Sequence, residues 1–238
     1  MTRLWIWCSV TAILGGGVVL GALGQAPASV PTPAPRPVPA AVPATTRMDA
    51  GDLQVRLGCA TCHGAQGRSP LSNIPVLAGQ RPEWLEARLK AFRRQGARNG
   101  SGIMPRYAAN LKDAQITALA RMYAADPTPP ATRPPADSDL VAGQTLYVRG
   151  RPRDRVIACG TCHTDAGTGT ATPLIPALRG QHAGYVTYRL NGYRALPVTT
   201  ADGQAGPQAM RTVARSLSDA DIRAVAAYVE AMPARSLP

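Results

Sequence analysis

The pentapeptide Cys-x-x-Cys-His occurs twice in this chain, at 59–63 and again 100 positions later at 159–163. Two intervening residues let one turn of chain bring both thiols to the two vinyl groups of a heme, while the adjacent imidazole faces the iron. This spacing is the attachment signature of c-type heme. The sequence therefore predicts two covalently bound heme c groups and a redox role. The predicted attachment residues and proximal iron ligands are Cys59, Cys62, His63, Cys159, Cys162 and His163.

A bare Cys-x-x-Cys pair also occurs in thiol redox sites and as half of a zinc site. The two copies here lie in similar segments, each followed by a suitably placed methionine, which favours heme over zinc or thiol chemistry. The chain has a single Phe and few other aromatic residues, so two small domains would fill their cores poorly. A buried heme would supply apolar volume to each core. The fifth cysteine, Cys8, lies in the apolar N-terminal stretch, and no structural disulfide is expected.

The N-terminal segment 1–24 contains an uncharged apolar run from Leu4 to Leu23. Its length of about 20 residues exceeds the ~7–15 of a usual signal core and suffices to cross a bilayer. The tripeptide 26–28, Ala-Pro-Ala, resembles a signal-peptidase site. We expect an uncleaved membrane anchor, which the length favours, or a secretory signal. Both place the rest of the chain outside the cytoplasm.

Two proline-rich segments divide the remainder of the chain. Residues 25–46 are dominated by Pro, Ala and Val, a composition that favours polyproline II and cannot build a core. We interpret this segment as a tether, which would reach roughly 70 Å at ~3.1 Å per residue, although a flexible tail has the same composition. The second segment, 127–136, marks a domain boundary, because helices usually stop before prolines. The predicted domains are 47–126 and 137–238.

An internal repeat relates these two domains. Each heme motif is followed by Ile-Pro-x-Leu-x-Gly-Gln, at 74–80 and 175–181. Further helical stretches in both halves are expected at 83–89, 183–190, about 112–124 and about 219–232. Ser218 and Asp221 resemble an N-cap and its acidic partner at the third helical position. No alternating run is long enough for a strand, so each half is predicted to be a small all-α domain.

Methionine is the expected second axial ligand of each iron. Three histidines are present, and with two of them proximal, the remaining His182 cannot complete both irons; we expect it at the surface or a heme edge. Met104 and Met210 each stand seven residues before a matching leucine, at Leu111 and Leu217. The predicted ligand pairs are His63 with Met104, which we expect in a loop, and His163 with Met210. The methionines within the terminal helices, Met122 and Met232, are expected to pack in the cores.

Methionine ligation has a chemical consequence. The thioether is a soft, neutral donor that raises the potential, and it fills the coordination sphere. No open iron position would then remain for oxygen or peroxide, so the sequence predicts electron carriage, not catalysis. A ligating His usually donates its second ring N–H to a fixed acceptor. The carbonyls of Pro75 and Pro176 are the candidates, although each Pro also suits a turn.

The chain from about Asp49 to Met232 resembles the c4-type dihaem cytochromes. The resemblance rests on CATCHGAQGRS, IPVLAGQ and IMP in the first half, and on CGTCHTDAG, IPALRGQHAGY, AM and LSDADI in the second. It implies two class I cytochrome c domains related by pseudo-twofold symmetry, with hemes near the domain interface. It also implies a periplasmic, often membrane-associated protein that delivers electrons to a terminal oxidase. The proline-rich tether and the basic stretch before Cys159 depart from the family pattern.

The formal net charge of +12 comes almost entirely from arginine. Cationic residues gather within one predicted helix and in a loop before the second heme motif: Arg88, Lys90, Arg93, Arg94 and residues 149–155. Nucleic-acid binding is not expected of an exported heme protein. We expect docking to acidic surfaces of redox partners, where charge sets the encounter rate and orientation. Pairing with heme propionates and genomic composition are other sources of the arginine excess.

Three functions are compatible with these features. The first is a dihaem carrier between a dehydrogenase or quinol-oxidising complex and a terminal oxidase. The second is a dedicated cytochrome subunit of a periplasmic dehydrogenase. The third is a dihaem peroxidase, which needs one iron with an accessible position and is disfavoured by two methionine ligands.

Overall fold

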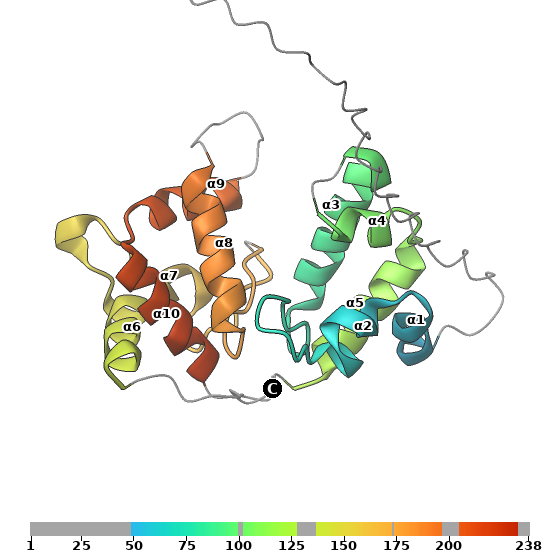
Figure 1. The fold of residues 1–238 in the computed structure, drawn as a ribbon, viewed down its shortest axis with the longest axis horizontal. Coiled ribbons are helices and arrows are strands. Elements are labelled where there is room, and N and C mark those ends of the chain that lie inside the picture. The colour runs from blue at the N-terminus through green and yellow to red at the C-terminus, as the bar shows by residue number, and fades with distance from the viewer. Residues whose placement is uncertain (1–48, 100–101, 128–136, 173, 197–204, 233–238) are drawn as a thin grey trace, which may run out of the picture. The chain divides into compact units, whose positions relative to one another are not determined.

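The computed structural model describes residues 49–99, 102–127, 137–172, 174–196 and 205–232 (Figure 1). The predicted N-terminal helix, the tether and the linker from residue 128 onward lie outside these ranges. Within them, no helix has the length and apolar character needed to cross a membrane.

The described chain is helical in both halves, as predicted. The helices of the first half are α1 (Ala50–Arg56), α2 (Cys59–His63), η1 (Ala65–Gly67), α3 (Pro82–Asn99), α4 (Met104–Ala108) and α5 (Asp113–Ala125). Those of the second half are α6 (Asp137–Arg149), η2 (Pro152–Asp154), α7 (Gly160–His163), α8 (Ala183–Ala195), α9 (Ala205–Arg215) and α10 (Asp219–Ala231). Across the described ranges the only strand-like pairing consists of isolated bridges, Arg151 with Val156 and Thr170 with Ile175.

Each half has its own hydrophobic core. In the first half, apolar residues of α5 such as Ile116 and Leu119 are fully buried and pack with Leu53 of α1 and Leu85 of α3. In the second half, the corresponding cluster is built on α10 and includes residues of α6 and α8. The 3–4 spacing of apolar residues along α5 and α10 therefore creates the faces on which the other helices pack.

The terminal helices begin and end within one residue of their predicted bounds. The start of α10 is fixed by a capping box in which Asp221 N donates to Ser218 Oγ at 3.1 Å and Ser218 N donates to Asp221 Oδ2 at 2.9 Å. These bonds satisfy backbone donors that a helix start leaves unpaired, so the predicted cap is confirmed.

Helix α10 crosses α6 at a glycine. A Cβ atom added to Gly143 would lie 2.1 Å from the Ala224 carbonyl oxygen, so only glycine permits the observed approach of the two backbones. One turn further along α6, the rings of Tyr147 and Tyr228 pack with their centroids 5.4 Å apart. This crossing fixes the position of α6, the helix that precedes the second heme motif in the chain.

Two buried glutamines form hydrogen bonds between the two halves. Gln181 Oε1 accepts from Val76 N at 2.8 Å and its Nε2 donates to Val76 O at 3.0 Å. In the reverse direction, Gln80 Oε1 accepts from Ala177 N at 2.8 Å and its Nε2 donates to Ala177 O at 3.0 Å. Gln80 and Gln181, like Val76 and Ala177, occupy equivalent positions of the repeat. The same pair of bonds is therefore made twice, as in a contact between identical subunits.

Candidate heme-binding sites

Both Cys-x-x-Cys-His motifs form a single helical turn. Helix α2 contains the first motif, and α7 follows Cys159 in the second. Residues three apart lie on one face of a helix, so each turn presents its two thiols side by side. The four described cysteines are not in disulfides, which leaves the thiols available for thioether bonds. At the end of each turn, Gly64 and Thr164 adopt positive φ values, of 72° and 67°, which redirect the chain after the histidine.

The two motif histidines are buried and held by backbone carbonyls. His63 Nδ1 lies 3.1 Å from Pro75 O, and His163 Nδ1 lies 3.0 Å from Pro176 O. A carbonyl oxygen only accepts hydrogen bonds, so the proton sits on Nδ1 and the lone pair of Nε2 is available to a metal. Burial lowers the pKa of both imidazoles, although the bond to the proline carbonyl partly opposes this. The predicted acceptors are confirmed, and each ring is held in the neutral tautomer whose Nε2 is available to a metal.

The first cysteine of each motif is not activated as a redox thiol would be. Burial raises the pKa of Cys59, and it raises that of Cys159 to about 11. A raised pKa disfavours the thiolate form that a reactive cysteine uses. Within the described ranges, no three His, Cys, Asp or Glu side chains converge as a zinc site would require. The buried Tyr123 hydroxyl interacts electrostatically with the Cys59 thiol and has no hydrogen-bond partner in the described part of the chain. Protonated thiols beside a neutral imidazole fit thioether attachment of heme c.

The structure places the predicted methionine ligands on helices. Met104 is the first residue of α4 and is followed by Pro105, whereas the sequence predicted a loop there. The helix starts at this point because proline is tolerated in a first turn, where its missing N–H would be unpaired in any case. Met210 lies within α9 and is half-buried against the second core. Met232 is buried in the second core, as predicted.

His182 is buried, so of its two predicted positions, the surface or a heme edge, the surface is wrong. Its Nε2 donates to the Ser69 carbonyl of the first half at 2.8 Å, and its Nδ1 lies 3.2 Å from Glu230 Oε1. Ser69 in turn donates from Oγ to the Cys62 carbonyl at 2.9 Å. Both ring nitrogens of His182 are therefore occupied, so this residue links the halves beside the first heme motif and has no free nitrogen for iron.

Two cationic side chains of the cluster on α3 form ion pairs. Lys90 lies 3.4 Å from Glu86, and Arg93 lies 2.6 Å from Asp113 of α5. Arg88 stacks over the Phe92 ring, with its guanidinium carbon 4.7 Å from the ring centroid. The predicted cluster is therefore present on this helix, but ion pairs engage Lys90 and Arg93, and a cation–π contact engages Arg88.

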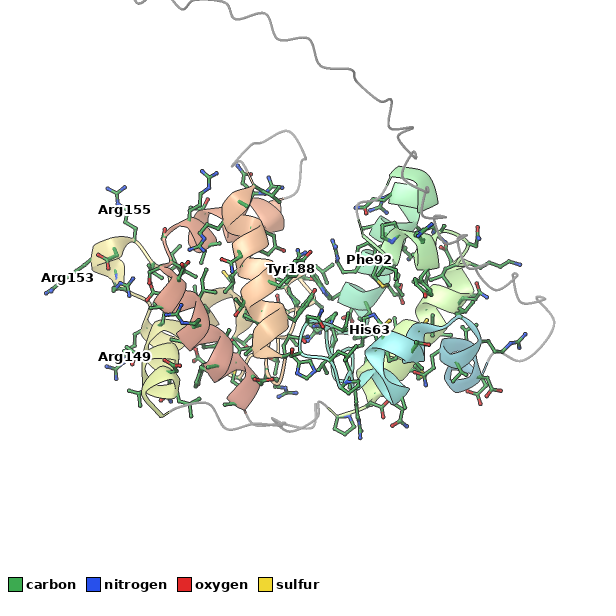
Figure 2. The ribbon with its side chains drawn as sticks, in the orientation of Figure 1. His63, Phe92, Arg149, Arg153, Arg155 and Tyr188 are labelled. Carbon is green, nitrogen blue, oxygen red and sulfur yellow. The ribbon has the colours of Figure 1, made fainter. Side chains whose placement is uncertain are left out.

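The basic loop before the second motif is ordered by one of its own arginines. Arg151 donates to both carboxylate oxygens of Asp221 at 2.8 Å and also pairs with Asp154. A backbone bridge between Arg151 and Val156 closes the turn. The other three cations, Arg149, Arg153 and Arg155, are exposed, and Figure 2 shows the side chains of Arg153 and Arg155 extending away from the helices. The loop thus carries positive charge that no described acidic residue neutralises.

Gln80 and Gln181 were not singled out as site residues from the sequence. The signal was present, because each closes the repeated Ile-Pro-x-Leu-x-Gly-Gln segment that also contains the proline acceptor. Their role depends on the other half of the chain, about 100 residues away, and pattern reasoning within one half does not reveal it.

Comparison with known proteins decides the family. Residues 140–233 match the family model "Cytochrome c", and residues 46–121 match "Cytochrome C oxidase, cbb3-type, subunit III". Cytochrome c4 of Azotobacter vinelandii is 37% identical over 183 residues, covering 73% of this chain and 84% of the relative. The chain belongs to the cytochrome c4 family. It is therefore a dihaem electron-transfer protein with two cytochrome c domains and two heme c groups.

Two further matches are to a solved structure and to a relative that is named for its function. The crystal structure of reduced recombinant cytochrome c4 from Pseudomonas stutzeri matches with a TM-score of 0.67 and 28% identity, covering 77% of this chain and 96% of that one. A thiosulfate dehydrogenase electron acceptor from Stutzerimonas stutzeri strain A1501 is 33% identical over 174 residues, covering 72% of this chain and 77% of the relative.

Proposed function

We propose that this chain is a periplasmic carrier that takes electrons from a respiratory donor and passes them to a terminal oxidase. The observation that carries the proposal is the occurrence, in both domains, of a buried histidine whose Nδ1 is bonded to a proline carbonyl and whose Nε2 is left for iron. The match of the first domain to an oxidase subunit supports an oxidase as the acceptor.

The proposed ligand sets follow the repeat. In the domain 47–126, Cys59 and Cys62 would anchor the first heme, with His63 and Met104 as axial ligands. In the domain 137–238, the corresponding residues are Cys159, Cys162, His163 and Met210. Heme c, when bound, supplies a one-electron couple. The chain's own residues fix the tautomer of each histidine and exclude water from it, since both histidines are only 7% exposed.

A pseudo-twofold relation between the domains is part of the proposal. It is supported by the reciprocal bonds between Gln181 and Val76 and between Gln80 and Ala177. The proposed role of this relation is to hold the Cys-x-x-Cys-His segments of the two domains in a constant relationship, so that electrons pass between the hemes.

The loop 149–155 is the proposed docking surface for an acidic partner. Arg153 and Arg155 are exposed and lie a few residues before Cys159 in the chain. Ile157, between the loop and the motif, is 58% exposed, which gives the surface an apolar element beside its charges. Interfaces between redox partners combine such elements, with charge guiding the encounter.

Periplasmic location and attachment through residues 1–24 complete the proposal. Heme c attachment requires export, and the apolar run from Leu4 to Leu23 is long enough to span a bilayer. The proline-rich segment 25–46 would then separate the heme domains from the membrane.

A second candidate function is that of electron acceptor for a periplasmic dehydrogenase. It is favoured by the similarity to a thiosulfate dehydrogenase electron acceptor. Reduction kinetics separate the two candidates: the purified protein is mixed with a quinol-oxidising complex or with thiosulfate dehydrogenase and its substrate, and the oxidation by terminal oxidase is then followed. Rapid reduction by the complex together with rapid oxidation by the oxidase supports the carrier. Reduction by the dehydrogenase alone contradicts it.

A further inference from the structure

The peptide unit between Pro75 and Val76 is hydrogen-bonded on both sides. Its carbonyl oxygen accepts from His63 Nδ1 at 3.1 Å, and its N–H donates to Gln181 Oε1 at 2.8 Å. His63 belongs to the first domain and Gln181 to the second. One peptide unit therefore connects the proximal histidine of one domain with a side chain of the other.

We call this chain of hydrogen bonds, from histidine through one peptide unit to a glutamine of the other domain, a relay. The second domain contains the same relay in the opposite direction. The carbonyl oxygen of Pro176 accepts from His163 Nδ1 at 3.0 Å, and the N–H of Ala177, in the same peptide unit, donates to Gln80 Oε1 at 2.8 Å. Each domain thus contributes one glutamine that acts on the other domain's histidine.

The orientation of both glutamine amides is fixed. Gln80 and Gln181 are each only 8% exposed. Besides the cross-domain bond, Oε1 of Gln80 accepts from Arg81 N at 2.9 Å, and Oε1 of Gln181 accepts from His182 N at 3.2 Å. Each Nε2 donates to a carbonyl of the opposite domain. Turning either amide over would place donors against donors in a buried site, which is costly. The oxygen therefore always faces the relay peptide.

We propose that Gln181 and Gln80 are positioning residues that set the reduction potential of the heme in the opposite domain. The inference rests on the proposed ligation of iron by His63 and His163. Donation by a peptide N–H polarises the peptide and strengthens its carbonyl as an acceptor. A stronger acceptor at Nδ1–H makes Nε2 a more basic ligand, and a more basic ligand favours the oxidised iron. Each glutamine therefore lowers the potential of the opposite couple.

The test compares Gln181→Leu with its mirror variant Gln80→Leu in the full holoprotein. Both couples are followed by spectroelectrochemical titration, and the first domain's couple is identified with Met104→Ala. We expect Gln181→Leu to raise the reduction potential of the first domain's heme. At a fixed applied potential, the ratio of reduced to oxidised heme should rise at least twofold, which corresponds to a shift of about 18 mV for one electron. Gln80→Leu should do the same to the second domain. Hydrogen exchange of the Val76 amide should accelerate in Gln181→Leu.

Two outcomes in the glutamine variants would overturn the proposal. One is the absence of any shift in a Gln181→Leu protein that retains both low-spin hemes. The other is an equal shift of both couples, as general loosening of the contact would give. Gly184→Ala supplies the control for loosening, because its Cβ would lie 2.7 Å from the Ser72 carbonyl oxygen and neither residue takes part in the relay hydrogen bonds. If this variant reproduces the selective shift, the relay is wrong. Gln181→Met, of similar length, replaces the Leu variant if that protein does not load heme. Failure of the ligand assignment would appear separately, as high-spin heme in the unsubstituted protein.

Discussion

Arg93 of α3 and Asp113 at the start of α5 lie 2.6 Å apart, and the same guanidinium donates to the Leu111 carbonyl at 2.7 Å. The second domain repeats this arrangement: Arg194 of α8 lies 2.6 Å from Asp219 and donates to the Leu217 carbonyl at 3.4 Å. In each domain the arginine closes the chain segment that contains the proposed methionine ligand. The repeat therefore extends from the heme motifs to the residues that hold the distal segments in place.

Replacing Arg93 with Ala should weaken ligation by Met104. The substitution removes a charged hydrogen bond to the Leu111 carbonyl, so we expect displacement of the methionine to become about fivefold easier, corresponding to about 1 kcal/mol. Cyanide titration of the oxidised protein measures this as a gain in affinity at one heme. Arg94→Ala is the matched control, since Arg94 is an exposed neighbour with no hydrogen-bond or ion-pair partner in the described ranges. Equal cyanide affinities in the two variants would contradict the assigned role.

Local features of the sequence were sufficient for much of the fold and site. The heme motifs, the bounds of α5 and α10, the Ser218 cap and the Pro75 acceptor all depend on residues close in the chain or on the repeat. Helices α1 and α6 were not predicted from the sequence, because α1 has only seven residues and the apolar residues of α6 form a weak stripe.

Features that depend on distant partners were missed or mistaken. His182 is buried because Ser69 and Glu230, which lie 113 and 48 positions away, bond its two nitrogens. The charge of Arg93 is compensated by Asp113, on another helix. In both cases the environment of the side chain is created by tertiary packing, and neighbouring residues in the sequence do not determine it.

Arg153→Ala combined with Arg155→Ala should slow association with an acidic redox partner. Both side chains are exposed and have no hydrogen-bond or ion-pair partner in the described chain, so the fold should be unchanged. We expect the association rate constant to fall about threefold at low salt and the difference to vanish near 1 M salt, where the Debye length is about 3 Å. Stopped-flow reduction kinetics measure both. Arg56→Ala with Arg121→Ala removes the same charge from the first domain; an equal loss in that control would show that net charge, not the loop, guides docking.

Gly143→Ala should destabilise the second domain. The added Cβ would clash with the Ala224 carbonyl of α10, and overpacking of this kind costs about 1–3 kcal/mol. Gly192→Ala is the control, because a Cβ at that position meets no atom within 4 Å beyond its chain neighbours and the backbone of its own helix. This substitution should stabilise α8 by up to about 1 kcal/mol. Denaturant unfolding monitored at the heme compares the two. Opposite signs are expected, and a neutral Gly143→Ala would show that the α6–α10 crossing is adjustable.

The Arg151–Asp221 ion pair should make the thermal stability of the protein depend on pH. Hydrogen bonding to Arg151 holds the pKa of Asp221 well below its usual range. A depressed pKa stabilises the fold above the unfolded value of about 3.9, and that stabilisation is lost as the pH falls toward the folded value. We therefore expect Asp221→Asn to lower Tm by about 2–4 °C at pH 7, with a difference that shrinks below pH 4. Calorimetry across this pH range measures the difference in Tm, with Asp139→Asn, at an exposed position, as the control. A difference that does not depend on pH would contradict the assigned ion pair.

Ligation of both irons by histidine and methionine is the central claim, and the far-red absorption band of methionine-ligated ferric heme tests it most directly. The measurement compares the band, per heme, in the oxidised unsubstituted protein and in Met104→Ala, Met210→Ala and the core variant Met122→Ala. The account predicts two low-spin hemes per chain, loss of about half of the band in each of the first two variants, and full amplitude in the third. A high-spin heme in the unsubstituted protein, or a full band in Met104→Ala or Met210→Ala, would contradict it.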